Sequence, residues 1–384
     1  MYLMKSTVTI MIFDMEYRRL KVIISGGGTG GHIFPALSIA AKLKEVNPQT
    51  EILFVGAEGR MEMEKVPAAG YKIIGLPVAG LQRKLTLSNF ALPFKVIKSI
   101  RMAKKLLREF KPDLAIGVGG YASAPLLWAA GSLGIPTLIQ EQNGYAGLTN
   151  KIVGKKAKSI CVAYDGMERF FPAERIVFTG NPIRKEIVPC TDEMKAEAFK
   201  FYGLDPQKKH IFIVGGSLGS GTLNNSMKKW ISDGCPGGEN VEVIWQCGKF
   251  YKASIDEFMA GVKCTGVQHS DFIQRMDLAY AAADIVISRS GASSVSELCA
   301  AQKAVIFVPS PNVAEDHQTH NAMALVNKYA AMMVTDADAP EKLMNTACQL
   351  LQEPERIALL EKNIAALART DAAMDIVKEV YRIV

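Results

Sequence analysis

The sequence predicts an α/β protein made of two domains, each built on a parallel sheet. Short apolar segments, which are typical of buried strands, alternate with helix-like segments along the chain. A glycine turn between a strand and a helix occurs twice, at residues 26–31 and again at residues 215–221. At 384 residues the chain is also too long for one ordinary core. Two domains that face each other across a cleft are therefore the simplest architecture.

The first half opens with an apolar strand at residues 21–25, and a helix at about residues 35–46 follows the glycine turn. Further strands are expected at residues 51–55, 114–118 and 137–140, because each is a short unbroken apolar run. Such runs are joined by helix-like segments, which predicts parallel pairing with helices on both faces of the sheet.

The pattern restarts in the second half, where four apolar runs predict strands at residues 211–214, 241–245, 284–288 and 304–308. Asn181-Pro182 and Pro189 interrupt regular structure, so we place the domain boundary there. The first domain then covers residues 21–180 and the second covers residues 181–363.

The two ends of the chain need separate interpretations. Only Lys5 precedes the apolar residues 7–13 and no small-residue cleavage site follows them, which argues against a signal peptide. We expect residues 1–20 to be an N-terminal extension, with residues 1–14 either disordered or upstream of the native start. From residue 354 onward the pattern is helical.

Composition excludes several classes of protein. The seven cysteines form no Cys-x-x-Cys pair, which argues against a disulfide framework or a zinc ribbon and favours a reducing compartment. No apolar run approaches the roughly 20 residues that span a bilayer.

The formal net charge is +7. Nine basic residues lie from Arg83 to Lys111 against the single acid Glu109. Apolar residues beside this charge predict an anionic membrane surface as a partner, and a solvated helix face is the alternative. Nucleic acid is not favoured, because no recognition motif accompanies the charge.

The first glycine turn reads Gly-Gly-Gly-Thr-Gly-Gly-His and ends at His32. Glycines allow close approach to a ligand, and the following helix N-terminus favours an anion. The string also fits a dinucleotide-binding fingerprint, with Glu58 after the second strand as the acidic partner. His32 tilts the interpretation away from that site, because histidine titrates in the range suited to a general base.

Polar residues follow two further strands of the first half. Tyr121 lies in a Gly-Gly-Tyr turn, and Glu141 begins the segment Glu-Gln-Asn-Gly. The carboxyl ends of parallel strands face the ligand crevice in such sheets. Glu141 is therefore a second candidate base or an orienting partner for His32, and ordinary loop chemistry is the alternative.

The second half offers groups suited to a nucleotide diphosphate. Ser217 lies in the turn Gly-Gly-Ser-Leu-Gly, and Arg184 follows Gly-Asn-Pro-Ile. Guanidinium pairs with phosphate oxygens in fork geometry. Glu297 ends Arg-Ser-Gly-Ala-Ser-Ser-Val-Ser-Glu after another strand, where a carboxylate can accept both hydroxyls of a ribose. His317 and His320 stand three residues apart, but no third metal ligand is evident and we expect no metal.

Together these segments resemble the MurG family of peptidoglycan glycosyltransferases, which convert lipid I to lipid II. The match runs in order from about Lys21 to Ala331. It includes Gly-Gly-Thr-Gly-Gly-His, Gly-Gly-Tyr, Glu-Gln-Asn-Gly with Gly-Leu-Thr-Asn, Gly-Asn-Pro-x-Arg, Gly-Gly-Ser-x-Gly and Arg-Ser-Gly-Ala-x-x-x-x-Glu. The ordered set is far more specific than any one motif.

The resemblance implies a GT-B fold, with the UDP donor in the C-terminal domain and the acceptor in the N-terminal domain. It also implies that a final helix, at about residues 364–384, returns to the N-terminal domain. The expected donor contacts are Thr29, Gly30, Gly31, Asn143, Arg184, Ser217, Ile273, Ala292, Ser293, Ser294, Val295, Ser296, Glu297 and Gln318. The expected acceptor side consists of His32, Tyr121, Glu141 and Asn150. Leu218 departs from the family's frequent glutamine, so any side-chain contact from that position is lost.

The implied reaction is an inverting transfer of N-acetylglucosamine from its UDP donor to the muramyl 4-hydroxyl of lipid I. His32 is the first candidate base and Glu141 the second. UDP-N-acetylglucosamine is a substrate, and no tightly bound metal or other cofactor is expected. The implied location is peripheral, on the cytoplasmic face of the plasma (inner) membrane, with cell-wall synthesis proteins as possible partners. Another GT-B enzyme such as a UDP-sugar 2-epimerase, an NAD-dependent dehydrogenase and a nucleotide-sugar sensor are the alternatives.

Overall fold

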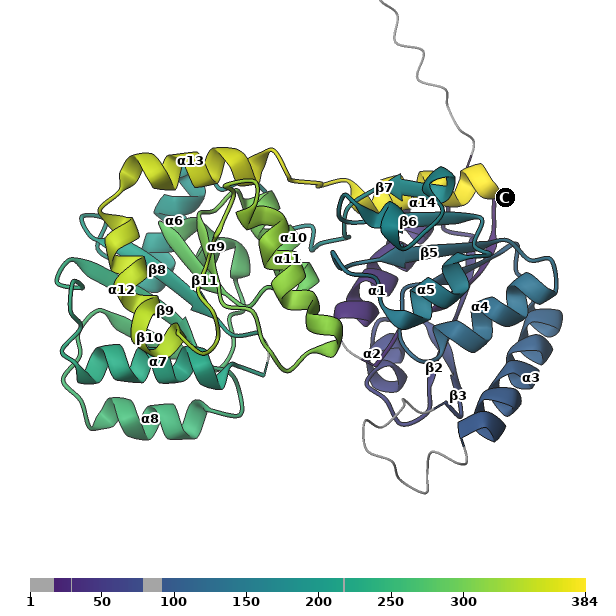
Figure 1. The fold of residues 1–384 in the computed structure, drawn as a ribbon, viewed down its shortest axis with the longest axis horizontal. Helices are drawn as coiled ribbons and strands as arrows, with labels where there is room; N and C mark the ends of the chain where they lie inside the picture. The colour runs from purple at the N-terminus through teal and green to yellow at the C-terminus, as the bar shows by residue number, and fades with distance from the viewer. Residues whose placement is uncertain (1–16, 29, 79–91, 217) are drawn as a thin grey trace, which may run out of the picture.

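The computed structural model describes residues 17–28, 30–78, 92–216 and 218–384. It contains two separate parallel sheets, each flanked by helices (Figure 1). This pair of Rossmann-like domains confirms the predicted GT-B architecture.

The first sheet has seven strands in the order β3-β2-β1-β4-β5-β6-β7, all of them parallel. They are β1 (Lys21–Ser25), β2 (Glu51–Ala57), β3 (Lys72–Leu76), β4 (Leu114–Gly117), β5 (Thr137–Glu141), β6 (Ser159–Val162) and β7 (Ile176–Phe178). The central strands β1, β4 and β5 are almost entirely buried, which explains why their sequences read as unbroken apolar runs.

Helices cover both faces of this sheet. They are α1 (Gly30–Val46), α2 (Glu62–Ala68), α3 (Leu92–Phe110), α4 (Ser123–Ser132), α5 (Leu148–Gly154) and α14 (Ala372–Ile383). One face packs against α1, α2 and α14, where Ile39, Val66 and Ile376 join a single core. The other face packs against α3, α4 and α5. Helix α1 begins at Gly30, earlier than the predicted residue 35, so Pro35 lies inside it.

The second sheet has six parallel strands in the order β10-β9-β8-β11-β12-β13. They are β8 (Lys209–Val214), β9 (Val241–Gln246), β10 (Val267–Ser270), β11 (Ile285–Ser288), β12 (Val305–Phe307) and β13 (Met332–Met333). The helices are α6 (Asp192–Tyr202), α7 (Gly221–Ser232), α8 (Lys252–Ala260), α9 (Met276–Ala282), α10 (Ala292–Ala301), α11 (His317–Val326), α12 (Ala339–Leu351) and α13 (Pro354–Ala365). One face packs against α6, α9, α10 and α11, and the other against α7, α8 and α12.

The chain crosses between the domains twice. Residues 179–191 lead from β7 to α6, and residues 366–371 lead back from α13 to α14 (Figure 1). Helix α14 packs against α1 and β6 through Ile376, Val377 and Val380, which have no exposed surface. The C-terminal helix is therefore part of the core of the first domain, and the helical residues before it belong to the second.

Candidate functional site

A buried carboxylate holds the first glycine turn in place. Glu62, the first residue of α2, is 1% exposed. Its Oε2 accepts a hydrogen bond of 2.9 Å from the Gly28 amide, and its Oε1 accepts one of 3.0 Å from the Ala57 amide. A Cβ atom on Gly27 would lie 2.2 Å from Oε1, so a side chain at that position would displace the Glu62 carboxylate. Glu62 therefore ties the turn to the end of β2, and the sequence had not singled it out.

His32 lies at the base of this turn and is half-buried. Its Nδ1 is 3.1 Å from the carbonyl oxygen of Gly27. Because a carbonyl only accepts, Nδ1 carries the proton of this hydrogen bond, and Nε2 of the neutral ring keeps a lone pair. Burial lowers the pKa of His32 below its ordinary value and outweighs the opposing effects of Glu141 and Glu62. The ring is therefore held neutral, as a proton acceptor must be.

The second turn of the first domain packs directly on the first. Gly119 and Gly120 both have positive φ, at +98° and +90°. A Cβ on Gly119 would lie 2.7 Å from Cδ2 of His32, and one on Gly120 would lie 2.3 Å from the carbonyl oxygen of Gly27. The structure therefore brings these two motifs together. Tyr121 follows them and is 48% exposed.

Glu141 is a support for its own loop. Its Oε1 accepts from the Asn143 amide at 3.1 Å and from Asn143 Nδ2 at 3.3 Å. Its Oε2 accepts from the Gly147 amide at 3.0 Å and from Asn150 Nδ2 at 2.9 Å. Asn150 is 3% exposed, and its Nδ2 also lies 3.4 Å from the Gln140 carbonyl oxygen. Four hydrogen bonds therefore occupy both carboxylate oxygens and hold the loop that follows Glu141.

Arg184 and Glu297 pair with each other in this structure. Arg184 Nε lies 2.7 Å from Glu297 Oε1, and Nη2 lies 2.6 Å from Oε2. The Tyr280 hydroxyl lies 3.4 Å from the same Oε2. Arg184 was expected to contact a diphosphate and Glu297 a ribose, but here the two side chains form an ion pair with each other. The Glu297 side chain is 8% exposed and the Arg184 side chain is 41% exposed.

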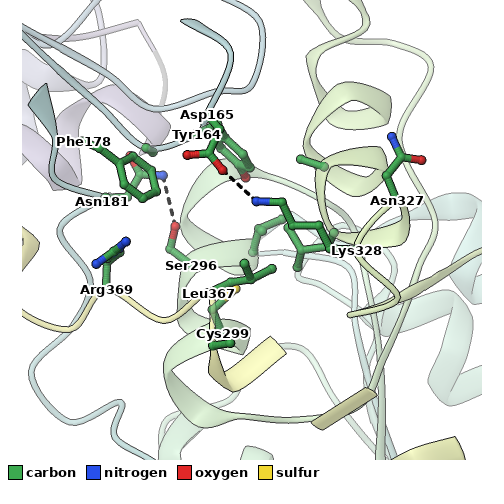
Figure 2. Close-up of a pocket in the computed structure, with 16 residues that line it drawn as sticks. Tyr164, Asp165, Phe178, Asn181, Ser296, Cys299, Asn327, Lys328, Leu367 and Arg369 are labelled. Carbon is green, nitrogen blue, oxygen red and sulfur yellow. Dashed lines mark hydrogen bonds and ion pairs between the residues drawn. The ribbon is translucent and has the colours of Figure 1, made fainter. Parts of the chain in front are cut away.

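Helix α10 divides the residues expected to line the donor pocket between two faces. Glu297 faces Arg184, whereas Val295 and Ser296 line a cavity of about 400 Å³ between the domains (Figure 2). Asn181 donates to Ser296 Oγ at 3.1 Å in that cavity. The remaining residues, Ala292, Ser293 and Ser294, form the first turn of α10, which begins after Gly291 without a side-chain cap. Free amides of such a turn favour an anion.

The cavity is also bordered by an ion pair between the domains. Asp165 Oδ2 lies 2.7 Å from Lys328 Nζ, and the Arg369 guanidinium lies 4.6 Å from the ring centre of Phe178 (Figure 2). Arg369 belongs to the crossover before α14, so three chain segments meet there.

The second glycine turn is braced by Gln246 at the end of β9. Its Oε1 accepts from the Gly215 amide at 3.0 Å, and its Nε2 donates to the carbonyls of Gly216 and Asp271 at 2.9 and 2.8 Å. Ser217 and, in the first turn, Thr29 lie outside the described residues. Gln246 is a supporting residue that sequence reasoning missed, since a glutamine at a strand end carries no motif.

The other expected donor contacts take varied positions. Ile273 is 5% exposed and belongs to the core of the second domain. Gln318 Oε1 accepts from the Ser310 amide at 2.9 Å, and its carbonyl accepts from Ser290 Oγ at 2.8 Å. Gly30 and Gly31 form the N-terminus of α1.

The loop after Glu141 touches the second domain through Asn321 on α11, another residue that the sequence did not single out. Asn321 Oδ1 accepts from the Gly144 amide at 2.8 Å. Its Nδ2 donates to Asn143 Oδ1 at 3.2 Å and to the Ser290 carbonyl at 3.1 Å. The turn at His32, the Glu141 loop and the start of α10 thus gather on one edge of the domain interface.

No three His, Cys, Asp or Glu side chains among the described residues are placed to hold a metal ion. Within the same residues, no helix is long and apolar enough to cross a membrane. Helix α3 exposes Phe94, Val96 and Ile97 by 76%, 41% and 48%. Val96 and Ile97 therefore do not belong to the packed face of this helix. The basic residues Arg83 and Lys84 lie outside the described part of the chain.

Comparison with known proteins places both domains in one family. The N-terminal domain model of glycosyltransferase family 28 matches residues 22–162, and its C-terminal domain model matches residues 210–380. A UDP-N-acetylglucosamine--N-acetylmuramyl-(pentapeptide) pyrophosphoryl-undecaprenol N-acetylglucosamine transferase of Parabacteroides distasonis is 55% identical over 96% of this chain and 99% of its own. The enzyme of the same name from Cytophaga hutchinsonii is 52% identical over 96% and 98%.

Solved structures agree with this assignment. Acinetobacter baumannii MurG is 29% identical, with a TM-score of 0.76 over 94% of this chain and 99% of its own. A UDP-N-acetylglucosamine 2-epimerase from Listeria monocytogenes has a TM-score of 0.65 over 95% and 96%, but only 13% identity, so it shares the fold alone. The chain belongs to glycosyltransferase family 28 and, within it, to the MurG family.

Proposed function

We propose that this chain transfers N-acetylglucosamine from UDP-N-acetylglucosamine to the muramyl 4-hydroxyl of lipid I, undecaprenyl-pyrophosphoryl-N-acetylmuramoyl-pentapeptide, and so makes lipid II for peptidoglycan. The observation that carries this proposal is the full-length identity of 55% to a relative named for that reaction. The site geometry supports it, because a neutral histidine on one domain lies near the interface with the donor-type helix of the other.

In the proposed mechanism, His32 is the general base of a single inverting displacement. The acceptor hydroxyl attacks the anomeric carbon, its proton passes to Nε2 of His32, and UDP leaves from the opposite face. The hydrogen bond from Nδ1 to Gly27 fixes the tautomer that this step needs. Glu141 supports the loop and acts electrostatically on His32. Tyr121 and Asn150 complete the proposed acceptor side.

The leaving UDP carries the charge that must be stabilised. We assign this role to Arg184, to Ser217 and to the amides at the N-termini of α7 and α10. When the donor binds, Glu297 would release Arg184 and accept hydrogen bonds from the ribose hydroxyls instead. The proposed contacts to uracil and sugar come from the remaining donor residues: Thr29, Gly30, Gly31, Asn143, Ile273 and Gln318.

We propose no tightly bound cation for this reaction. An Asp-x-Asp sequence occurs at Asp336 to Asp338, but Asp336 pairs with Arg289 and Asp338 pairs with Lys342. These carboxylates therefore support the fold beside β13. Transfer that persists in EDTA would agree with this assignment.

The acceptor is a lipid, and we propose peripheral attachment to the cytoplasmic face of the plasma membrane through α3. Phe94 and Ile97 are exposed on this helix, and Lys95, Lys98 and Arg101 are exposed on the same stretch. Exposed apolar groups among basic ones favour an anionic bilayer. Cell-wall synthesis proteins are proposed partners at that surface.

The decisive experiment measures transfer of labelled N-acetylglucosamine from its UDP donor to a short-chain lipid I analogue. Glu297→Ala is the site variant, and Glu355→Ala, exposed on α13, is the matched control. Product formation that collapses only in Glu297→Ala supports the donor, acceptor and site together. UDP binding without transfer refutes the acceptor, release of the 2-epimer indicates an epimerase, and tight NADH binding without UDP binding indicates a dehydrogenase.

A further inference from the structure

A chain of side-chain hydrogen bonds crosses from one domain to the other. Asn143 Nδ2 donates to the buried carboxylate of Glu141 at 3.3 Å. Asn143 Oδ1 accepts from Asn321 at 3.2 Å, and Asn321 donates again to the Ser290 carbonyl at 3.1 Å. The chain therefore begins at the loop beside His32 and ends at the residue two positions before α10.

Asn321 is satisfied by both domains at once. It has no exposed surface, and two of its three hydrogen bonds go to Asn143 and Gly144 of the first domain. Separation of the domains would break both of these bonds and leave only the one to Ser290. The hydrogen bonds of Asn321 to Asn143 and Gly144 therefore stabilise the closed arrangement of the two domains.

The segment that Asn321 reaches is held from its other side as well. Arg169 donates to the Gly144 carbonyl at 2.7 Å. The Tyr145 ring stacks on His320, with centroids 5.0 Å apart, and Lys151 Nζ lies 3.9 Å from the Tyr145 centroid. Residues 143–145 are thus fixed between α11 and the first domain, and their position depends on where α11 stands.

We propose that Asn321 is a positioning residue that couples domain closure to the arrangement of the reacting groups. Through Asn143 and Gly144 it sets the loop that follows Glu141, the carboxylate that acts electrostatically on His32. Through Ser290 it sets the turn that begins the donor helix. This inference rests on the proposed transferase activity, and it adds a residue whose role is to orient both sides of the site.

The test compares Asn321→Ala and Asn321→Asp with wild type and with Asn363→Ala. Asn363 is a matched control, because its side chain makes one 2.9 Å hydrogen bond to the Tyr329 carbonyl within the second domain. We expect kcat for transfer to fall at least tenfold in Asn321→Ala, while the Kd for UDP alone stays within twofold. Asn321→Asp should fall further, because its carboxylate would face the Asn143 and Ser290 oxygens. Asn363→Ala should keep kcat within twofold.

Closure is measured separately by the radius of gyration in solution, which needs no turnover. Asn321→Ala should give a larger radius of gyration than wild type while the chain stays folded, and Asn363→Ala should give the wild-type value. A kcat within twofold of wild type overturns the proposal, as does a loss of UDP affinity that equals the loss of kcat. A wild-type protein that does not transfer sugar refutes the proposed function instead, and the radius of gyration then decides whether Asn321 closes the domains.

Discussion

Replacement of Glu62 by glutamine tests whether one buried carboxylate holds the first glycine turn. In the wild-type chain its two oxygens accept from the amides of Gly28 and Ala57 at 2.9 and 3.0 Å. Glutamine has the same shape but only one acceptor oxygen. Its amide group would therefore face a backbone N–H as donor against donor.

The size of the effect follows from these contacts. Loss of one hydrogen bond to a charged group costs about 1.5–3 kcal/mol. Removal of a buried charge offsets part of this cost, so we expect a loss of about 2 kcal/mol in the free energy of unfolding. In a domain of about 150–250 residues, each kcal/mol lowers the melting temperature by about 2–4 °C, which predicts a decrease of about 4–8 °C.

The assay is thermal unfolding at neutral pH, with Glu64→Gln as the control. Glu64 lies on the same helix, but its side chain is 80% exposed and its partner Lys65 is at 3.7 Å. A surface substitution of this kind should change stability by less than about 0.5 kcal/mol. If the two variants melt within about 1 °C of each other, Glu62 does not hold the turn. Turnover should fall in Glu62→Gln alone, because the displaced turn leads into His32.

Three further outcomes are expected. The acid limb of kcat/KM should lie below pH 6.5, because burial lowers the pKa of His32. The fold disfavours the imidazolium, so the stability that the neutral ring provides is present above pH 6.5 and is lost as the pH falls below it. His32→Ala should remove the acid limb from the pH profile. Glu297→Gln should weaken UDP binding about tenfold in calorimetry, because one ribose hydroxyl loses a charged acceptor, and an unchanged affinity would place the ribose elsewhere. Joint replacement of Phe94 and Ile97 by serine should weaken sedimentation with anionic vesicles about tenfold without changing transfer to a soluble acceptor, and equal binding would exclude α3 as the docking face.

The strands that the sequence predicted are those at the centres of the sheets. The ones it missed include all four sheet edges, β3, β7, β10 and β13, together with the neighbouring β6. An edge strand pairs on one side only and stays partly exposed, so its sequence need not be an unbroken apolar run. Strand β10 has the sequence Val-Gln-His-Ser, and β13 has two residues. The pattern of apolar residues therefore predicts the buried central strands of such a sheet and misses the strands at its edges.

The site shows a similar division. Glycine turns, His32 and Glu297 carry local signals, because a turn beside a strand needs particular residues at fixed positions. Glu62 and Asn321 act through tertiary contacts, with Glu62 reaching Gly28 across 34 residues and Asn321 reaching Asn143 across 178. Nothing in the local sequence marks a glutamate or an asparagine for such a role. Supporting residues of this kind become visible only when the folded chain brings them beside the motifs.

The pairing of Arg184 with Glu297 bears on how a donor would enter. Both groups were expected to contact the nucleotide, yet in this structure they pair with each other through two hydrogen bonds of 2.7 and 2.6 Å. The Glu297 carboxylate is 8% exposed, and a carboxylate that is so deeply buried needs a partner. Arg184 is that partner, and its half-exposed side chain remains free to move toward a diphosphate. In the mechanism that we propose, donor binding is an exchange in which the ribose hydroxyls replace the guanidinium at Glu297 and the diphosphate binds the guanidinium. It follows that the two residues are energetically coupled: Arg184→Ala and Glu297→Ala together should cost less UDP affinity than the sum of the single losses, and strict additivity in this cycle would show that the exchange does not occur.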